Sequence, residues 1–375
     1  MMRESTPSKW RVWFERLDWV LLGLIAALGG IGVLNLASVA DATSGKAVHL
    51  TQAGWLLVGF VVMGIVSLVD YRVIERWAYL LYGVVVLLLV AVLAVGTELN
   101  GSQRWLNLGV ILVQPSELLK LVVIVVTARY FNRRDLPRSY SLFELVRIGA
   151  VVGAAVCLVL IQPDLGTSLI ILAIFFTMVL FEGVKPSSLI CLVLAGLFAL
   201  PLAWSFVLKE YQQDRVISYL NLDDDEQGQS WQVRQSMIAF GSGRMWGKGH
   251  VEGTQVQKGF VPEHENDFVS ANWAEERGFV GMVFLLGLYS ALLLWALHIS
   301  RRARDRFGAH IGVGVAALIF WHVVVNLGMV TGVLPVVGLT LPLLSYGGSS
   351  LLTMMVALGL LLNVSMRRKP LAAAY

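Results

Sequence analysis

The stretch FVPEHENDFVSANWAEERGFVG, residues Phe260–Gly281, runs directly into an apolar segment that covers residues 278–300. A run of about 20 apolar residues is long enough to cross a bilayer as a helix. The stretch before it gathers five carboxylates within 14 residues: Glu263, Glu265, Asp267, Glu275 and Glu276. The junction therefore predicts a polar, acidic segment at the edge of a membrane span.

The composition of the whole chain agrees with this junction. The chain has 375 residues, of which 57% are hydrophobic and 14% charged, and its mean hydropathy is +0.72. A soluble domain carries about 25% charged residues, so this chain has too few charges to build a water-exposed surface. Its apolar runs lack the period-2 alternation of a membrane barrel. We expect an all-α polytopic membrane protein in which residues 1–375 form a single integral membrane domain.

Apolar windows predict about ten transmembrane helices. They are residues 18–40, 50–69, 78–97, 115–131, 145–162, 166–182, 187–208, 278–300, 308–330 and 344–365. The end of the first window, Ser38–Ala40, resembles a signal-peptidase site, but the run is long and many spans follow, so we expect a retained helix. Cys157 and Cys191 lie inside apolar runs and are expected to be small core residues rather than a disulfide.

Lys and Arg residues follow alternate spans, which predicts the orientation. The basic positions are Arg3, Lys9, Arg11, Arg16, Arg72, Arg76, Arg129, Arg133, Arg134, Arg138, Lys185, Arg301, Arg302, Arg304, Arg306, Arg367, Arg368 and Lys369. We expect both termini in the cytoplasm and an outer face made of residues 97–114, 162–165, 209–277 and 331–343. The large outer loop, 209–277, then joins spans seven and eight. We attribute the net charge of +4 to basic cytoplasmic loops that lie beside anionic lipid, and not to binding of nucleic acid.

The expected outer face carries most of the unusual polar residues. Glu117 and Lys120 are three residues apart at the head of a span and can pair on one helical face; they either form a packing salt bridge or line a functional cavity. In residues 162–169, Asp164 or Thr167 can cap a helix, which we prefer to a catalytic role.

Two glycine-containing segments leave alternatives open. Residues 229–253 could hold a lipid pyrophosphate on backbone N–H groups beside Lys248, or could be a turn-rich re-entrant loop; the glycine spacing does not fit a Walker A motif. In residues 338–352, Pro342 and two glycines interrupt an apolar run. Such backbone must be buried in protein or line a cavity, unless the segment is simply the kinked start of a helix.

Asp267 is the candidate general base. It stands at the mouth of a span, where partial removal from water helps a carboxylate accept a proton. Glu275 and Glu276 are expected to be acids that favour a helix N-terminus.

Five ordered motifs resemble the SEDS family (shape, elongation, division and sporulation), and two of them are closest to its elongation branch. They are NGSQRWLNLGVILVQPSELLKL, QPDLGTSL, QVRQSMIAFGSGRMWGKG, VPEHENDF with WAEERGFVG, and MVTGVLPVVGLTLPLLSYGGSSLL. The resemblance implies a ten-helix glycosyltransferase of the bacterial cytoplasmic (inner) membrane. Such an enzyme polymerises lipid II, an undecaprenyl-pyrophosphate-linked disaccharide-pentapeptide, on the outer face, beside a class B penicillin-binding protein that crosslinks the product.

The family's essential aspartate matches Asp267, although Glu265 and Asn266 replace the usual His-Thr pair. Its functional arginine matches Arg104, and its Glu–Lys pair matches Glu117 and Lys120. We expect Asp267 to deprotonate the GlcNAc 4-hydroxyl. The expected pyrophosphate ligands are Arg104, Lys248, Arg215 and Ser345, and the expected cavity-shaping residues are Glu117, Lys120, Gln114 and Asp164.

A divalent cation, Mg²⁺ or Mn²⁺, could assist, with Asp267 and Glu263 as candidate oxygen ligands. The sequence is also compatible with two rival functions. A lipid-precursor flippase would also use intramembrane charges and broken helices, and a non-catalytic scaffold would only position the penicillin-binding protein.

Overall fold

A computed structural model describes most of the chain. It describes residues 15–39, 47–99, 102–107, 109, 112–134, 139–206, 213–214, 217, 219, 229–261, 263 and 265–368. Eight of its helices are long and apolar enough to cross a membrane. They are α2 (Trp19–Val39), α3 (Val48–Leu68), α4 (Tyr71–Val95), α6 (Leu142–Ile161), α7 (Leu165–Glu182), α12 (Val269–Arg301), α13 (Arg306–Val330) and α14 (Gly348–Met366). The chain is therefore a helical, multi-span membrane protein.

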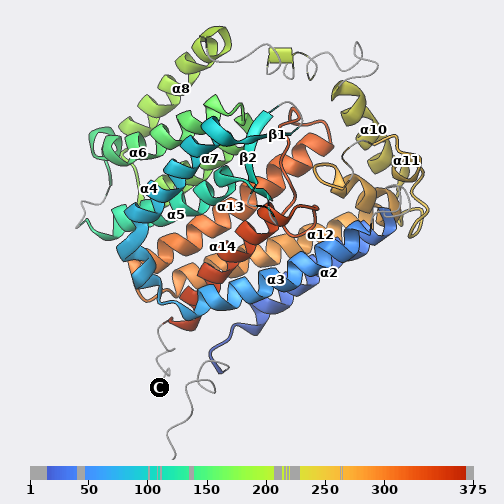
Figure 1. Ribbon diagram of the computed structural model, residues 1–375, viewed down its shortest axis with the longest axis horizontal. Helices are drawn as coiled ribbons and strands as arrows, with labels where there is room; N and C mark the ends of the chain where they lie inside the picture. Colours follow the sequence, from blue (N-terminus) through green and yellow to red (C-terminus); the bar gives the residue numbers. More distant parts are fainter. Residues whose placement is uncertain are drawn as a thin grey trace, which may run out of the picture.

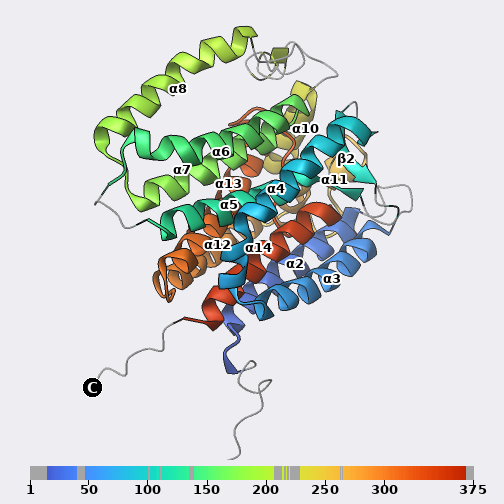
Figure 2. The same ribbon diagram turned by 60° about the vertical axis from the view of Figure 1, so that its left-hand side comes forward.

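The two remaining predicted spans are also helical. Helix α5 (Pro115–Asn132) carries Glu117, Lys120 and Arg129, yet it is buried along nearly its whole length. Helix α8 (Pro186–Phe206) contains Pro201 and lies at the edge of the bundle in both views (Figures 1 and 2). Charged residues are tolerated on α5 because protein, rather than lipid, surrounds it.

Three helices form the centre of the bundle. The apolar windows of α14 and α13 are 78% and 67% buried, against 22% for α3 and α4. Helix α5 packs with α13, α4 and α7, and the views show α13 and α14 crossing the middle of the molecule (Figure 1). The peripheral helices expose apolar faces, as lipid-facing helices do, whereas the polar chemistry collects around α5, α13 and α14.

The basic segments meet at one end of the bundle. The Tyr71 hydroxyl donates to Asp305 at 2.8 Å, and Arg367 Nη1 donates to the Ser67 carbonyl at 3.0 Å. Arg129 Nη1 donates to the Arg76 carbonyl at 2.6 Å. Segments that precede α4, α13 and the C-terminus therefore share one end, as the alternation of basic loops predicts.

The opposite end carries the extramembrane structure (Figure 1). Strands β1 (Thr97–Leu99), β2 (Ser102–Asn107) and β3 (Leu112–Val113) form an antiparallel sheet in the order β1-β2-β3. The spans are helical, as predicted, and this small sheet in the loop between α4 and α5 was not predicted, because its strands are too short for the sequence pattern to reveal. The large predicted loop contains α10 (Gln229–Ser242) and α11 (Thr254–Gln257), and the first turns of α12 belong to it as well.

A kink at Gly278 divides α12 into an outer segment and the predicted span. Gly278 has φ 64° and ψ −162° within an otherwise helical run. A Cβ at this position would lie 2.3 Å from the Gly247 nitrogen. Only glycine fits here, because the backbone is left-handed and the 243–247 turn approaches too closely for any side chain. The kink thus docks residues 243–249 against the head of the span.

Candidate active site

A largely buried non-helical segment, residues 337–346, forms the floor of the candidate site. It lies between α13 and α14, with Leu339, Leu341, Leu343 and Leu344 buried at 4% exposure or less. Backbone removed from water and lacking helical bonds needs other hydrogen-bond partners.

Side chains from three spans supply donors to this segment. Asn326 donates to the Leu339 carbonyl at 2.6 Å, and Tyr289 donates to the Pro342 carbonyl at 2.6 Å. Gln52 donates to the Ser345 carbonyl at 3.0 Å. Of the two alternatives for residues 338–352, the structure favours non-helical backbone packed in protein: helix α14 begins only at Gly348, and residues 341–345 are buried.

Asp267 lies in a turn packed on this floor. Asn326 Nδ2 also donates to the Asp267 carbonyl at 2.8 Å, so one amide joins the turn to the floor. A Cβ added to Gly338 would lie 3.4 Å from Asp267 Oδ2, which puts the carboxylate against the floor backbone. The Asp267 side chain is partly exposed. The carboxylate is thus held at the boundary between the outer segments and the start of α12.

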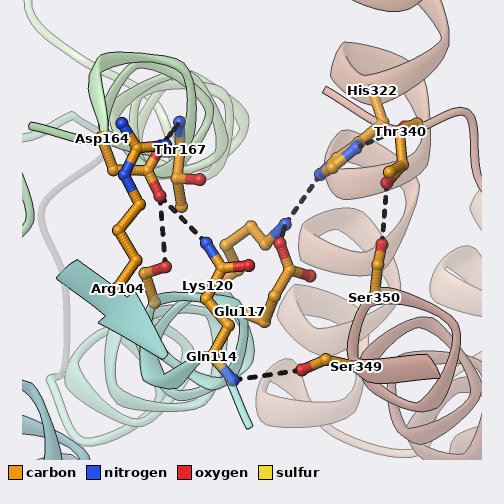
Figure 3. A network of polar contacts seen from close by, with 11 residues as sticks. Arg104, Gln114, Glu117, Lys120, Asp164, Thr167, His322, Thr340, Ser349 and Ser350 are labelled. Atoms are coloured by element: carbon orange, nitrogen blue, oxygen red, sulfur yellow. Dashed lines mark hydrogen bonds and ion pairs between the residues drawn. The ribbon is translucent and has the colours of Figure 1, made fainter. Parts of the chain in front are cut away.

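Lys120 sits at the centre of a buried polar network (Figure 3). Its Nζ donates to Glu117 Oε1 at 2.7 Å and lies 3.0 Å from His322 Nε2. His322 Nδ1 lies 3.1 Å from the Thr340 carbonyl. Lysine can only donate and a carbonyl can only accept, so His322 carries its proton on Nδ1 and accepts from Lys120 on Nε2. The predicted Glu117–Lys120 pair is confirmed, and histidine connects it to the floor.

Asp164 organises the neighbouring part of the same network (Figure 3). It caps α7 by accepting from the Thr167 N–H at 3.2 Å, so of the two predicted capping residues, Asp164 and Thr167, the aspartate is the cap. Gln114 Nε2 donates to its Oδ2 at 3.1 Å. Arg104, on β2, lies 3.7 Å from Asp164 and donates to the carbonyls of Gln162 and Pro163. The sheet therefore delivers Arg104 to the α6–α7 turn, with about a quarter of its side chain exposed.

Two serines at the head of α14 complete the ring of contacts. The Gln114 N–H donates to Ser349 Oγ at 3.3 Å, and Ser350 Oγ lies 2.8 Å from Thr340 Oγ1. Residues from β2, α5, α7, α13 and α14 thus converge on one region, which continues through the floor to Asp267.

Lys248, an expected pyrophosphate ligand, pairs with an acid of the chain in this structure. Its Nζ donates to Glu275 at 2.5 Å and to Thr254 at 2.8 Å; Glu275 is fully buried. The N–H groups of Gly247, Lys248 and Gly249 all donate to backbone carbonyls. They are not a phosphate cradle, and the structure favours the turn-rich loop.

Ser345 positions the Asp267 turn. Its hydroxyl donates to the Asn266 carbonyl at 2.6 Å and accepts from the Leu341 N–H at 2.8 Å. Glu263 is exposed and accepts from Asn266 Nδ2 at 2.8 Å. Arg215 lies outside the described residues. No cluster of three His, Cys, Asp or Glu side chains suited to a metal occurs in the described part of the chain.

The sequence analysis missed His322 and Asn326. Both lie inside an apolar span, four residues apart and therefore on one helical face. Both are buried, at 2% and 0% exposure. A polar residue inside a span is usually functional and paired, so these two could have been singled out, but only the fold reveals that their partners are carbonyls of the floor.

Comparisons with known proteins agree with this architecture. Residues 15–370 match the model of the cell cycle protein family FtsW/RodA/SpoVE. The peptidoglycan glycosyltransferase MrdB of Escherichia coli K12 is 37% identical over 372 residues, covering 98% of this chain and 99% of that protein. Stage V sporulation protein E of Bacillus subtilis is 37% identical over 312 residues, covering 82% of this chain and 84% of that protein.

Two solved structures are also similar to this chain, in sequence and in fold. The rod shape determining protein RodA of Thermus thermophilus matches with a TM-score of 0.70 and 32% identity, covering 94% of this chain and 98% of that one. A chain from a structure described as coordination of polymerization and crosslinking by a peptidoglycan synthase complex matches with a TM-score of 0.80 and 34% identity, covering 93% and 97%. The chain belongs to the FtsW/RodA/SpoVE family, the SEDS family of membrane proteins.

Proposed function

We propose that this chain polymerises lipid II into glycan strands, in the manner of the elongation branch of its family. It is a peptidoglycan glycosyltransferase, and the match to MrdB over almost the full length of both chains supports this activity. The observation that carries the proposal is the position of Asp267: a partly exposed carboxylate just before α12, packed against the floor segment that joins the spans α13 and α14.

The chemistry requires a base at such a boundary, because lipid II has its tail in the membrane and its sugars in water. The GlcNAc 4-hydroxyl oxygen attacks the anomeric carbon that bears undecaprenyl pyrophosphate. A C–O bond forms there while the bond to pyrophosphate breaks, and the leaving group keeps the electron pair. Asp267 accepts the hydroxyl proton as the new bond forms. Displacement from the opposite face turns an α-linked donor into a β-linked product.

Positive charge must stabilise the departing pyrophosphate. Among the residues that the structure describes, Arg104 is the strongest candidate to bind the pyrophosphate. Its planar guanidinium suits phosphate oxygens, and a quarter of its side chain is exposed. Lys248 and Ser345 act indirectly in this proposal. Lys248 compensates the buried charge of Glu275, and Ser345 fixes the turn that bears Asp267.

A divalent cation fits this arrangement only as a partner of the substrate. Mg²⁺ is often held by one or two carboxylates together with substrate phosphates. Asp267 would supply the protein oxygen, and the cation would neutralise charge on the pyrophosphate. Glu263 already binds the Asn266 amide, which makes it the weaker of the two candidate ligands.

The similarity to a chain of a peptidoglycan synthase complex supports a class B penicillin-binding protein as partner. The similarity to MrdB supports a location in the bacterial inner membrane. We assign the end that bears the sheet and α10–α12 to the outer face, where the lipid II sugars and the crosslinking partner would meet.

The test is polymerisation of lipid II by purified protein carrying Asp267→Asn. Replacing the base should lower the initial rate at least 100-fold, since general base catalysis contributes about 10²–10⁴-fold. Glu252→Gln is the matched control, because Glu252 is an exposed acid of the same outer segment and should leave the rate unchanged. A normal rate in Asp267→Asn would refute the assignment of the base. Lipid II translocation in liposomes without any polymerisation would favour a flippase.

A further inference from the structure

The end of the bundle away from Asp267 contains a cavity lined by arginines. Its volume is about 670 Å³, and it lies between α4, α5 and α6. The lining residues are Arg76, Tyr79, Arg129, Tyr130, Arg133, Arg134, Arg147, Ile148 and Val151. Five are cationic and none is acidic. Along α5, Arg129 is about 18 Å from Glu117 at 1.5 Å per residue, so this cavity is separate from the candidate active site.

Three of the arginines are held in place by protein contacts. Arg129 donates to the Glu75 and Arg76 carbonyls at 2.8 and 2.6 Å. Its guanidinium lies 4.8 Å from the centre of the Tyr79 ring. Arg133 pairs with Glu75 at 3.0 Å, and the Arg134 guanidinium lies 4.4 Å from the centre of the Tyr130 ring. The cations are thus oriented by backbone carbonyls and aromatic rings, and only Arg133 is neutralised by an acid of the described chain.

Arg76 and Arg147 have no ion pair with any acid that the structure describes, and both are exposed. They face the cavity from α4 and α6, on either side of the α5 arginines. Several guanidinium groups around one cavity favour a ligand with phosphate oxygens, because the guanidinium fork matches them.

The surroundings of the cavity favour a lipid over a soluble anion. Ile148 and Val151 continue the lining along α6 towards the middle of the span. The neighbouring surfaces of α4 and α6 expose large apolar side chains: Trp77 at 51%, Leu80 at 57%, Phe143 at 89% and Val146 at 57%. A headgroup in the cavity would therefore have apolar surface beside it for its acyl chains. Basic pockets between spans on the cytoplasmic side are suited to anionic headgroups.

We propose that this arginine cavity binds the phosphate headgroup of an anionic membrane phospholipid between α4, α5 and α6. The bound lipid would fix the end of α5, the helix whose other end carries Glu117 and Lys120. The proposal does not depend on the glycosyltransferase activity, because lipid binding is measured without lipid II.

Native mass spectrometry of the purified full-length chain, titrated with phosphatidylglycerol, tests the proposal. The double variant Arg76→Gln/Arg147→Gln should bind this lipid at least about tenfold more weakly, since each surface cation contributes appreciably to attraction of anionic lipid. These two side chains make no ion pair with a described acid, so the variant should keep the melting temperature of the parent. Arg76→Lys/Arg147→Lys retains the charge and should recover part of the affinity.

Arg301→Gln/Arg304→Gln is the matched control. It removes the same charge from exposed arginines of another basic segment, and it should leave phosphatidylglycerol binding unchanged. Phosphatidylcholine should bind equally to all variants. Equal binding of phosphatidylglycerol by the parent and the Gln variant would overturn the proposal. Saturable binding of inorganic phosphate in the absence of any preference for phosphatidylglycerol would overturn the lipid assignment.

Discussion

The side-chain amide of Asn326 donates two hydrogen bonds, one to the carbonyl of Asp267 and one to the carbonyl of Leu339. Replacing it by alanine leaves one buried acceptor, at Leu339, and one part-buried acceptor, at Asp267, without this donor. An unsatisfied buried group costs about 1–3 kcal/mol, so Asn326→Ala should lower the free energy of unfolding by about 2–4 kcal/mol. It should also slow polymerisation at least tenfold, because the Asp267 turn loses one of its anchors, the other being Ser345. Thermal unfolding and initial rates measure the two effects.

Asn363→Ala provides the control for Asn326. Asn363 is equally buried and donates to the Val66 and Ser67 carbonyls at 2.8 and 3.3 Å, at the end of the bundle away from Asp267. It should lose stability without a matching loss of rate. If both variants lose activity only in proportion to their stability, Asn326 has no specific positioning role.

Replacing only one member of the buried Glu117–Lys120 pair should destabilise the protein more, per residue replaced, than replacing both members together. Removing one partner of a buried ion pair leaves an uncompensated charge, at a cost of about 3–5 kcal/mol. Glu117→Gln and Lys120→Met should each destabilise strongly, and the double variant should be less destabilised than the sum of the two. A double-mutant cycle on thermal unfolding measures the coupling. Strict additivity would mean that the 2.7 Å contact contributes no coupling energy.

At the scale of elements, Gly278 forms the kink between the outer part of α12 and its membrane span. Gly278→Ala would force a Cβ into the 243–247 turn at a left-handed φ, so it should destabilise by several kcal/mol and reduce activity. Gly287→Ala is the matched control in the same helix. Nothing lies within 4 Å of a Cβ at Gly287, and alanine is favoured over glycine in a helix by about 1 kcal/mol. Limited proteolysis and melting temperature should distinguish the two variants. A Gly278→Ala variant as stable as the parent would contradict the requirement for glycine at this kink.

The sequence predicts elements well where one physical rule dominates. Apolar length locates the spans, and helical spacing predicts the Glu117–Lys120 pair. Capping preferences limit the start of α7 to Asp164 or Thr167, and the structure has Asp164. Lys248 shows the limit of this reasoning. Its glycine neighbours favour a phosphate loop and a tight packing turn equally, and only the position of Glu275, 27 residues away in the chain, distinguishes them.

Across the whole molecule, the two ends of the bundle have different chemistry. One end joins the basic segments through contacts such as Arg306 to Glu182 and to the Arg134 carbonyl. The other holds the sheet, the kinked start of α12 and the floor. A polymerase that acts on a lipid-linked sugar needs its base on one side only, whereas a transporter with alternating access needs gates on both. The asymmetry of polar residues therefore favours the polymerase.

The side on which Asp267 lies can be tested without any enzymology. We expect the end with α11 outside, because the positive-inside rule assigns the basic end to the cytoplasm. In a background with Cys157→Ala and Cys191→Ala, Lys258→Cys and Arg304→Cys would each introduce one exposed thiol at opposite ends. A membrane-impermeant maleimide should label Lys258→Cys in intact spheroplasts and Arg304→Cys only after lysis. The reverse pattern would put Asp267 in the cytoplasm. A base on that side cannot act on a glycan strand that grows on the outer face of the membrane.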